Sequence, residues 1–271
     1  MSKSDKSHSN AAESAAPPVA LTRPHTWDRP TGAVDDPSAW MRDVDDPEFL
    51  QYLQAENDYS DQHFAPQADL IETIFDEVRS RVQETDMSTP VRNGPWWYVS
   101  RTEEGLSYPL HQRGPSLDSA DRFVLLDENI EAEGHEYFDL GALDASHDHT
   151  MFAWSIDTSG DERYTLRVRR FDEDGAASST EDLIGGIANA GTGWSSDGQW
   201  LFYVRADDQE RPSQVWRHRV DTSSTEDDEL IFEELDERFF VAIGETRSNE
   251  WIVIHTASKT SSEVRLAPSV L

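Results

Sequence analysis

Ser195 is the residue of this sequence whose neighbours come nearest to those of a hydrolase nucleophile. Ser195 lies in the segment Gly-Trp-Ser-Ser-Asp at 193–197, which approaches the Gly-x-Ser-x-Gly turn that exposes a hydrolase nucleophile. Asp197 stands where the second glycine belongs. The small size of glycine is what allows the sharp turn from strand to helix at a nucleophile. The residues after 90 show no alternation of strands with long helices that could hold such a turn. We therefore predict a structural turn at Ser195 and no catalytic residue in this chain.

Histidines and carboxylates offer two further kinds of chemistry, general base catalysis and metal binding. His147 and His149 flank Asp148 in a polar turn, and we expect both rings to be exposed to solvent. His135 is expected to make a structural hydrogen bond inside the fold. The segment Asp-Thr-Ser-Gly-Asp-Glu at 157–162 has the composition of a calcium loop but not the ligand spacing of an EF-hand. We predict no metal site and no cofactor.

Two helical patterns precede this part of the chain. Asp46 can cap a helix whose first turn contains Pro47, a residue favoured there because it needs no N–H partner. This helix is predicted to stop before Pro66. A second helix is predicted from apolar residues at three-to-four spacing, namely Leu70, Ile71, Ile74, Val78 and Val82. Each helix therefore has an apolar face that another surface must cover.

From about Pro90 the sequence changes to short strands, and these strands repeat. Four segments combine a turn with an apolar, aromatic strand and begin 55, 49 and 52 residues apart, at Asn93, Asp148, Asp197 and Asn249. A second strand follows each of them, beginning at Tyr108, Thr165, Gln214 and Glu263. Two strands in the same relative places at a period near 50 indicate the blades of a β-propeller. Five tryptophans at alternate strand positions are predicted to pack between blades: Trp97, Trp154, Trp200, Trp216 and Trp251.

The predicted fold is mainly β, a partial β-propeller of about three and a half blades preceded by a two-helix N-terminal arm. We divide the chain into a disordered leader at 1–23, the helical arm at 24–86 and the truncated propeller at 87–271. Three blades and a partial fourth cannot close a ring, since propellers need roughly four to eight blades. We therefore expect the chain to be a fragment or a truncated product.

The composition restricts the class of partner. The chain has 54 Asp and Glu against 23 Lys and Arg, a formal charge of −31, which excludes phosphate contacts of the kind that bind nucleic acid. No apolar run approaches the roughly 18 residues that a membrane span needs, and the first residues lack a hydrophobic signal core. A cytoplasmic location is the expectation. The acidity is typical of a solvated surface, or it could steer cationic peptides toward a site.

Three segments, at 36–43, 211–218 and 258–265, are similar to the prolyl oligopeptidase family of serine peptidases, and the last two resemble its oligopeptidase B branch. Residues 36–43 (DPSAWMRD) are similar to the family's DPY-x-WLED signature. Residues 211–218 (RPSQVWRH) and 258–265 (SKTSSEVR) are similar to the oligopeptidase B segments RPYQVWRH and SKTTSEVR. The resemblance extends from about residue 36 to 268. It departs at Ser38, where the family usually has Tyr, and at His147, which replaces the Pro of a common turn.

The resemblance implies a seven-bladed propeller that covers an α/β-hydrolase domain with a Ser-Asp-His triad, located beyond Leu271. The parent enzyme would hydrolyse short peptides after Arg or Lys, and the propeller would gate and filter these substrates. The helical arm would pack on the hydrolase domain of the same protein. This chain alone would be inactive. Two alternatives remain open, a stand-alone propeller that acts as a binding scaffold, and a prolyl oligopeptidase that cleaves after Pro.

The loops between the two recurring strands are the candidate functional site. They lie at 101–105, 157–163, 205–212 and 257–262, and their equivalent places in each blade predict that they emerge on one rim. Ordinary charged turns would explain them equally well. The functional interpretation is an interface with the hydrolase domain, with ion pairs from Asp161, Glu162 and Arg211.

Overall fold

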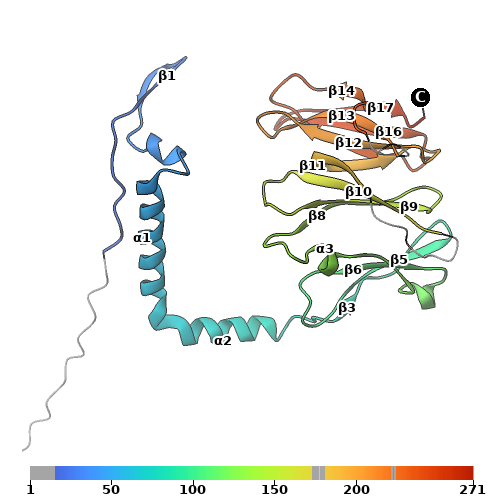
Figure 1. Cartoon of the computed structure of the whole chain (residues 1–271), viewed down its shortest axis with the longest axis horizontal. Helices are drawn as coiled ribbons and strands as arrows, with labels where there is room; N and C mark the ends of the chain where they lie inside the picture. Colours follow the sequence, from blue (N-terminus) through green and yellow to red (C-terminus); the bar gives the residue numbers. More distant parts are fainter. Residues whose placement is uncertain (1–15, 173–176, 178–180, 221, 223, 271) are drawn as a thin grey trace, which may run out of the picture. The chain divides into compact units, whose positions relative to one another are not determined.

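The structure is a computed structural model that describes residues 16–270 apart from 173–176, 178–180, 221 and 223 (Figure 1). It divides into two compact units, Met1–Gln83 and Glu84–Leu271, and each is described by itself. Residues 1–15 of the predicted leader lie outside the described residues, and residues 16–23 contain no helix or strand. No helix among the described residues is long and apolar enough to cross a membrane.

The first unit contains both predicted helices, but the second ends at Arg79, so Val82 of the predicted stripe lies outside it. Its elements are β1 (Thr26–Arg29), β2 (Gly32–Asp35), η1 (Ala39–Arg42), α1 (Pro47–Phe64), η2 (Ala65–Gln67) and α2 (Ala68–Arg79). The pairing of β1 with β2 was not predicted, because each strand has only four residues and both are largely exposed. Such short strands show no alternation of buried and exposed side chains from which pairing could be predicted.

Asp46 begins α1 in the predicted way. Its carboxylate accepts the backbone N–H groups of Glu48 at 2.8 Å and Phe49 at 3.3 Å, which satisfies donors that a helix start leaves free. Arg23 donates to the same carboxylate at 2.7 Å, and this bond holds the pKa of Asp46 below its ordinary value. The end of the predicted leader is therefore tied to the first turn of α1.

The second unit is built from antiparallel sheets stacked in chain order (Figure 1). The first sheet contains β3 (Asp86–Met87), β4 (Val91–Asn93), β5 (Trp96–Thr102), β6 (Leu110–Gly114) and β7 (Phe123–Asp127). The second contains β8 (Asp139–Ala145), β9 (Met151–Asp157), β10 (Tyr164–Arg170), β11 (Glu181–Trp194), β12 (Trp200–Ala206), β13 (Pro212–Arg219) and β14 (Glu229–Glu233). The third contains β15 (Phe240–Glu245), β16 (Trp251–Ala257) and β17 (Ser262–Pro268). The helices among the described residues of this unit are short: η3 (Leu117–Ser119) follows β6, and α3 (Glu128–Glu131) follows β7.

The seven-stranded sheet consists of two blades that share β11. The first part of β11 pairs with β10 up to Ile187, and its last part, Thr192–Trp194, pairs with β12. One strand is thus the outermost of the second blade and the innermost of the third. At this change of partner Gly191 has a φ of +95°, a conformation that favours glycine. This arrangement confirms the predicted mainly β, partial propeller fold and differs from it in that two blades are continuous.

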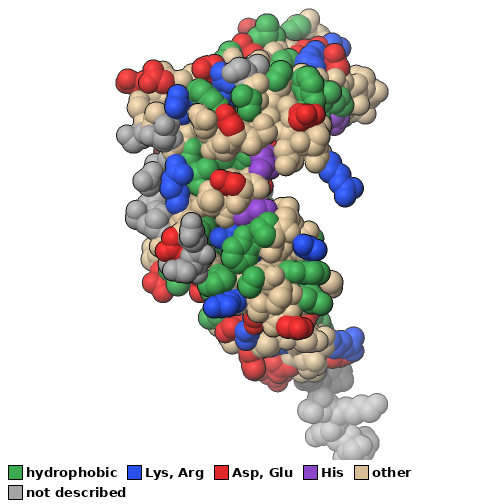
Figure 2. Space-filling view, turned by 90° about the vertical axis from the view of Figure 1, so that its right-hand side faces the viewer, with side chains coloured by type: hydrophobic (Ala, Val, Ile, Leu, Met, Phe, Trp, Pro, Cys, Tyr) green, Lys and Arg blue, Asp and Glu red, His purple; other side chains and the backbone are tan. Residues whose placement is uncertain are grey.

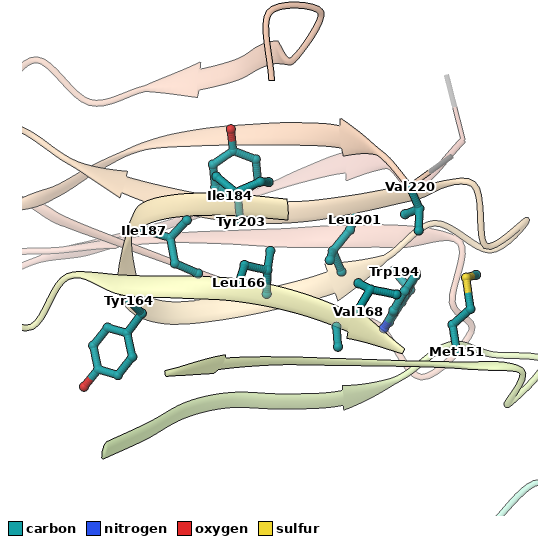
Figure 3. Packing of buried hydrophobic residues seen from close by; sticks show 11 residues of the cluster. Met151, Tyr164, Leu166, Val168, Ile184, Ile187, Trp194, Leu201, Tyr203 and Val220 are labelled. Atoms are coloured by element: carbon teal, nitrogen blue, oxygen red, sulfur yellow. The ribbon is translucent and has the colours of Figure 1, made fainter. Parts of the chain in front are cut away.

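Both faces of the middle strands are buried. Successive side chains on a strand point to opposite faces, so one strand contributes to two cores. On β9, Met151 and Ala153 face the core shared with the third blade, whereas Phe152 and Trp154 face the core shared with the first. Figure 3 shows the core between the second and third blades, where Leu166, Trp194 and Tyr203 are fully buried. Each core therefore holds two blades together.

The tryptophan predictions hold on the second and third blades and fail on the last, while Trp97 on the first blade is only partly buried. Trp154 is fully buried, and Trp200 and Trp216 pack against blade cores. Trp251 is 38% exposed, because Ile252 and its alternate neighbours on β16 take the face toward the third blade. Trp251 therefore lies on the outer face of the fourth blade, the sheet of β15, β16 and β17, and does not pack between blades of this chain.

Replacing Gly191 tests the close approach of β11 to β15. A Cβ atom at this position would lie 2.2 Å from the backbone oxygen of Ile243, so Gly191→Ala should lower the free energy of unfolding by about 2 kcal/mol or more. Gly186→Ala is the matched control, since Gly186 also has a positive φ, +71°, but no atom lies within 4 Å of its added Cβ. Urea unfolding measures both. Equal midpoints for the two variants would contradict the close packing of these strands.

Candidate functional site

The candidate rim consists of the four loops that follow the second strand of each blade. They join β5 to β6, β9 to β10, β12 to β13 and β16 to β17. Each loop joins two neighbouring antiparallel strands at the same place in its blade. Because the blades are stacked in the same order and direction, these loops share one rim, as predicted.

Asp157 organises the loop of the second blade. Its carboxylate accepts the backbone N–H groups of Ser159 at 2.8 Å, Gly160 at 3.0 Å and Glu162 at 2.9 Å. Burial raises the pKa of Asp157, but these hydrogen bonds hold it below its ordinary value. The carboxylate is thus engaged by backbone donors. Among the described residues no group of three His, Cys, Asp or Glu side chains could hold a metal ion.

Asp161 and Glu162 are displayed at the tip of this loop. Asp161 accepts the Ser159 hydroxyl at 2.6 Å and the Arg163 N–H at 3.2 Å, while Glu162 has a φ of +60°. Both side chains are exposed. They carry negative charge that another surface could contact, as the predicted interface requires.

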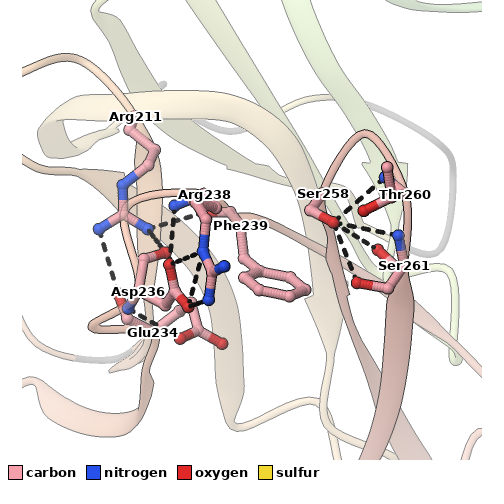
Figure 4. Close-up of polar contacts among 8 residues, drawn as sticks. All are labelled: Arg211, Glu234, Asp236, Arg238, Phe239, Ser258, Thr260 and Ser261. Carbon is pink, nitrogen blue, oxygen red and sulfur yellow. Dashed lines mark hydrogen bonds and ion pairs between the residues drawn. The ribbon is translucent and has the colours of Figure 1, made fainter.

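Arg211, the third predicted interface residue, is directed into its own domain instead (Figure 4). It is 9% exposed and donates to Asp207 at 2.9 Å and to the backbone oxygens of Glu234 at 3.1 Å and Phe239 at 2.7 Å. Its guanidinium thus joins the β12–β13 loop to the segment before β15. The geometry assigns Arg211 an internal role, because little of its charge reaches the rim.

A cavity of about 240 Å³ lies between the loops of the second and third blades. Four acidic side chains line it, those of Asp161, Glu162, Asp207 and Glu210, with one basic side chain, that of Arg163. Arg163 and Glu210 lie 3.5 Å apart across the two loops. The excess of acid would attract a cationic group to this part of the rim.

Ser195 is a structural turn residue, as predicted. It is fully buried, its hydroxyl donates to Asp197 at 2.6 Å, and it accepts the backbone N–H of Trp200 at 2.9 Å. Ser146 repeats the pattern one blade earlier, with bonds to Asp148 at 2.7 Å and Met151 at 2.9 Å. The hydroxyl closes the turn between the first two strands of a blade.

The predictions for the three histidines are wrong. His149 is 6% exposed and its Nδ1 lies 2.7 Å from the Tyr98 hydroxyl, so it packs between the first two blades. His147 is partly buried, with Nε2 3.2 Å from a Glu245 carboxylate oxygen. His135, expected inside the fold, has an exposed side chain. Figure 2 shows histidine side chains in the hollowed middle of one face.

Sequence reasoning missed a cluster of acids where the inner strands of three blades meet. Glu245 on β15 accepts the backbone N–H of Trp194 on β11 and contacts His147. Asp144 on β8 hydrogen-bonds Thr192 on β11. Burial, with the nearby charge of Glu245, raises the pKa of Asp144 to about 7. Burial also raises the pKa of Glu245, which the Trp194 N–H and His147 partly offset.

Comparisons with known proteins agree with this architecture. Residues 17–269 match the family model described as prolyl oligopeptidase, N-terminal β-propeller domain. The chain is 35% identical over 95% of its length to Dipeptidyl aminopeptidase BI of Pseudoxanthomonas mexicana. This chain belongs to the prolyl oligopeptidase family. Another family member, Protease 2 of Moraxella lacunata, is 31% identical over 92% of the chain.

Solved structures of the prolyl oligopeptidase family share this fold. Oligopeptidase B from Leishmania major superimposes with a TM-score of 0.83 at 29% identity, over 95% of this chain and 38% of that chain. Oligopeptidase B from Trypanosoma brucei gives 0.81 at 30% identity, over 94% of this chain and 38% of that chain. The chain spans 38% and 36% of the lengths of the two curated relatives.

Arg211→Lys tests the internal role of the guanidinium. A lysine cannot reach several carbonyl oxygens with a planar fork, and buried acceptors would lose their partners. We expect a loss of about 2–4 kcal/mol in the free energy of unfolding. Arg238→Lys is the control, because Arg238 pairs with Asp236 while its side chain is 80% exposed, so the urea midpoint should hardly move. An Arg211→Lys variant as stable as the parent would contradict the internal role of the guanidinium and favour a role for Arg211 in the interface.

Asp144→Asn tests the acid cluster through pH. The folded pKa of about 7 lies above the ordinary value of 3.8, so between these values the folded state keeps a proton that the unfolded state has lost. Stability should therefore fall as pH rises from 4 to 8, by at most roughly 4 kcal/mol. The Asn variant should lose this part of the pH dependence, being more stable than the parent at pH 8 and similar at pH 4. Urea unfolding across this range measures it, and parallel curves for the two proteins would contradict the raised pKa.

Proposed function

We propose that this chain is the propeller region of an oligopeptidase B-like serine peptidase that hydrolyses short peptides after Arg or Lys. The observation that carries the proposal is the similarity to two oligopeptidase B structures, at TM-scores of 0.83 and 0.81 with 29% and 30% identity. The propeller would admit short peptides to the active site and exclude folded proteins. A cytoplasmic location, expected from the sequence, is part of the same proposal.

The partner of the arm would be the hydrolase domain of the same protein. On α2 the apolar stripe is open to solvent, with Leu70 57%, Ile74 52% and Val78 60% exposed. Burial of such side chains stabilises a contact by roughly 1.5–3 kcal/mol each. A hydrolase domain is the proposed cover because the relatives that this chain matches extend well beyond the matched region.

The acidic rim would serve substrates and the interface together. Asp161 and Glu162 are exposed beside the cavity between two blades, and they would pair with cations of the hydrolase domain. Their negative field would also raise the local concentration of cationic peptides. Arg211 would support this rim from inside by fixing the β12–β13 loop.

A second candidate activity is release of dipeptides from a free N-terminus. It is favoured by the 35% identity to Dipeptidyl aminopeptidase BI. Substrates with free and blocked N-termini distinguish it from the endopeptidase activity. A stand-alone binding scaffold is less well supported, because it leaves the α2 stripe without a purpose. Cleavage after Pro has weaker support, since prolyl oligopeptidase B from Galerina marginata shares only the fold, at 17% identity.

The chain alone should not hydrolyse chromogenic peptide amides that end in Arg or Lys. The near match to a nucleophile elbow at Ser195 is a buried turn, and a buried hydroxyl that makes two hydrogen bonds cannot attack a peptide. Release of chromophore is measured before and after repurification, with a serine-directed inhibitor as control. Persistent turnover that the inhibitor abolishes would contradict this assignment.

A chimera tests the proposed function. The chain replaces the matched region of Leishmania major oligopeptidase B, and the solved structure defines the junction. We expect hydrolysis of short Arg peptides within about tenfold of the parent enzyme and no cleavage of folded proteins. Ile74→Glu should weaken the interdomain contact and lower activity, whereas Glu72→Gln on the same helix should not. A folded chimera whose catalytic serine is labelled by inhibitor but which turns over no peptide would overturn the proposal.

A further inference from the structure

The first blade holds a serine, a histidine and a glutamate in one hydrogen-bonded line. Ser100 Oγ on β5 lies 3.0 Å from His111 Nδ1 on β6. The other ring nitrogen, His111 Nε2, lies 2.6 Å from Glu128 Oε1 at the start of α3. Glu128 is 5% exposed. The three groups are thus arranged as nucleophile, base and orienting acid are arranged in serine hydrolases.

The chemistry of the partners fixes the direction of these hydrogen bonds. A carboxylate only accepts, so the Nε2–H of His111 donates to Glu128. In the neutral ring this leaves Nδ1 with a lone pair, and the Ser100 hydroxyl donates to it. A histidine held in this tautomer can take the serine proton.

Ser100 and His111 also line a cavity. It has a volume of about 320 Å³ and lies between the first and second blades, a size within the range of small-molecule sites. Its apolar walls include Leu125, Leu143 and Phe152. A small acyl group could therefore lie beside the serine hydroxyl.

We propose that Ser100 is a nucleophile toward small activated carboxylic esters, with His111 as its base and Glu128 as a positioning residue. Ser100 Oγ bonds to the ester carbonyl carbon while its proton passes to His111 Nδ1. The carbon–oxygen bond to the alcohol then breaks, and the alcohol leaves with that proton, so an acyl group remains on Ser100. Water attacks this acyl group by the same route, which releases the carboxylic acid and restores the hydroxyl.

The backbone restricts the substrate to esters with a good leaving group. The N–H of Ser100 donates to the Ser88 hydroxyl at 2.9 Å, so it is engaged and does not stabilise an oxyanion as in efficient peptidases. Peptide bonds have a much poorer leaving group and stay intact. The inference goes beyond the proposed function, because Ser100 lies in the propeller and acts without a hydrolase domain.

The test uses p-nitrophenyl acetate and the whole 271-residue chain. We expect an initial release of nitrophenol, and peptide mapping by mass spectrometry should place the acetyl group on Ser100. Ser100→Ala and His111→Gln should each lower the rate by at least roughly tenfold. Ser116→Ala is the matched control, because Ser116 bonds another serine, Ser119, at 2.7 Å, and its rate should equal the parent's.

Glu128→Gln separates positioning from folding. The amide oxygen can still accept a hydrogen bond from His111 Nε2–H, but it lacks the charge that stabilises an imidazolium. We expect slower acylation at an unchanged half-saturating ester concentration and an unchanged melting temperature. Acetyl groups found only on other side chains, or equal rates for the parent and Ser100→Ala, would overturn the proposal. Circular dichroism on each variant excludes loss of fold as the cause of a lower rate.

Discussion

The constraint on which this structure depends is that a propeller blade must be covered on both faces. All seven residues of β9 are buried, and side chains of opposite direction enter two different cores. β12 repeats this, with Leu201 facing the second blade and Phe202 facing the fourth. Because each core belongs to two blades, neighbouring blades stabilise one another. The last sheet shows the consequence, since Val264 and Leu266 on β17 are 57% and 55% exposed.

The same constraint explains which features could be predicted from sequence. A blade repeats its turn, and the hydroxyl of Ser146, Ser195 or Thr246 accepts the N–H five residues later each time. Polar turn residues before an aromatic strand therefore recur at a period near 50, and the fold follows from that period. The helix start at Asp46 was equally predictable, because capping depends on residues within one turn. The propeller and the helical arm could be predicted because both depend on such local patterns.

The candidate sites depend on contacts that leave no local pattern. Arg211 was assigned to an interface because its loop is charged, yet its partners include backbone oxygens more than 20 residues away, and a carbonyl oxygen has no sequence signature. His147 meets Glu245 from another blade, 98 positions along the chain. Ser100, His111 and Glu128 are closer, but three elements must fold before they meet. Sequence reasoning named the exposed acids Asp161 and Glu162 on the rim, but it could not show that Arg211 is buried.

Several arginine side chains of this acidic chain pack against aromatic rings inside the propeller. All but three of the 23 basic residues are Arg, and several lie over aromatic rings, among them Arg217 over Trp200 and Arg113 over Trp96, each at 4.2 Å. A guanidinium is weakly hydrated and planar, so it can be buried against a ring where a lysine ammonium would lose more hydration. Internal arginines neutralise little of the charge that solvent and ligands encounter. The carboxylates of Asp161 and Glu162 on the rim are exposed to solvent, whereas the guanidinium groups of Arg113 and Arg217 are buried and stabilise the blades from within.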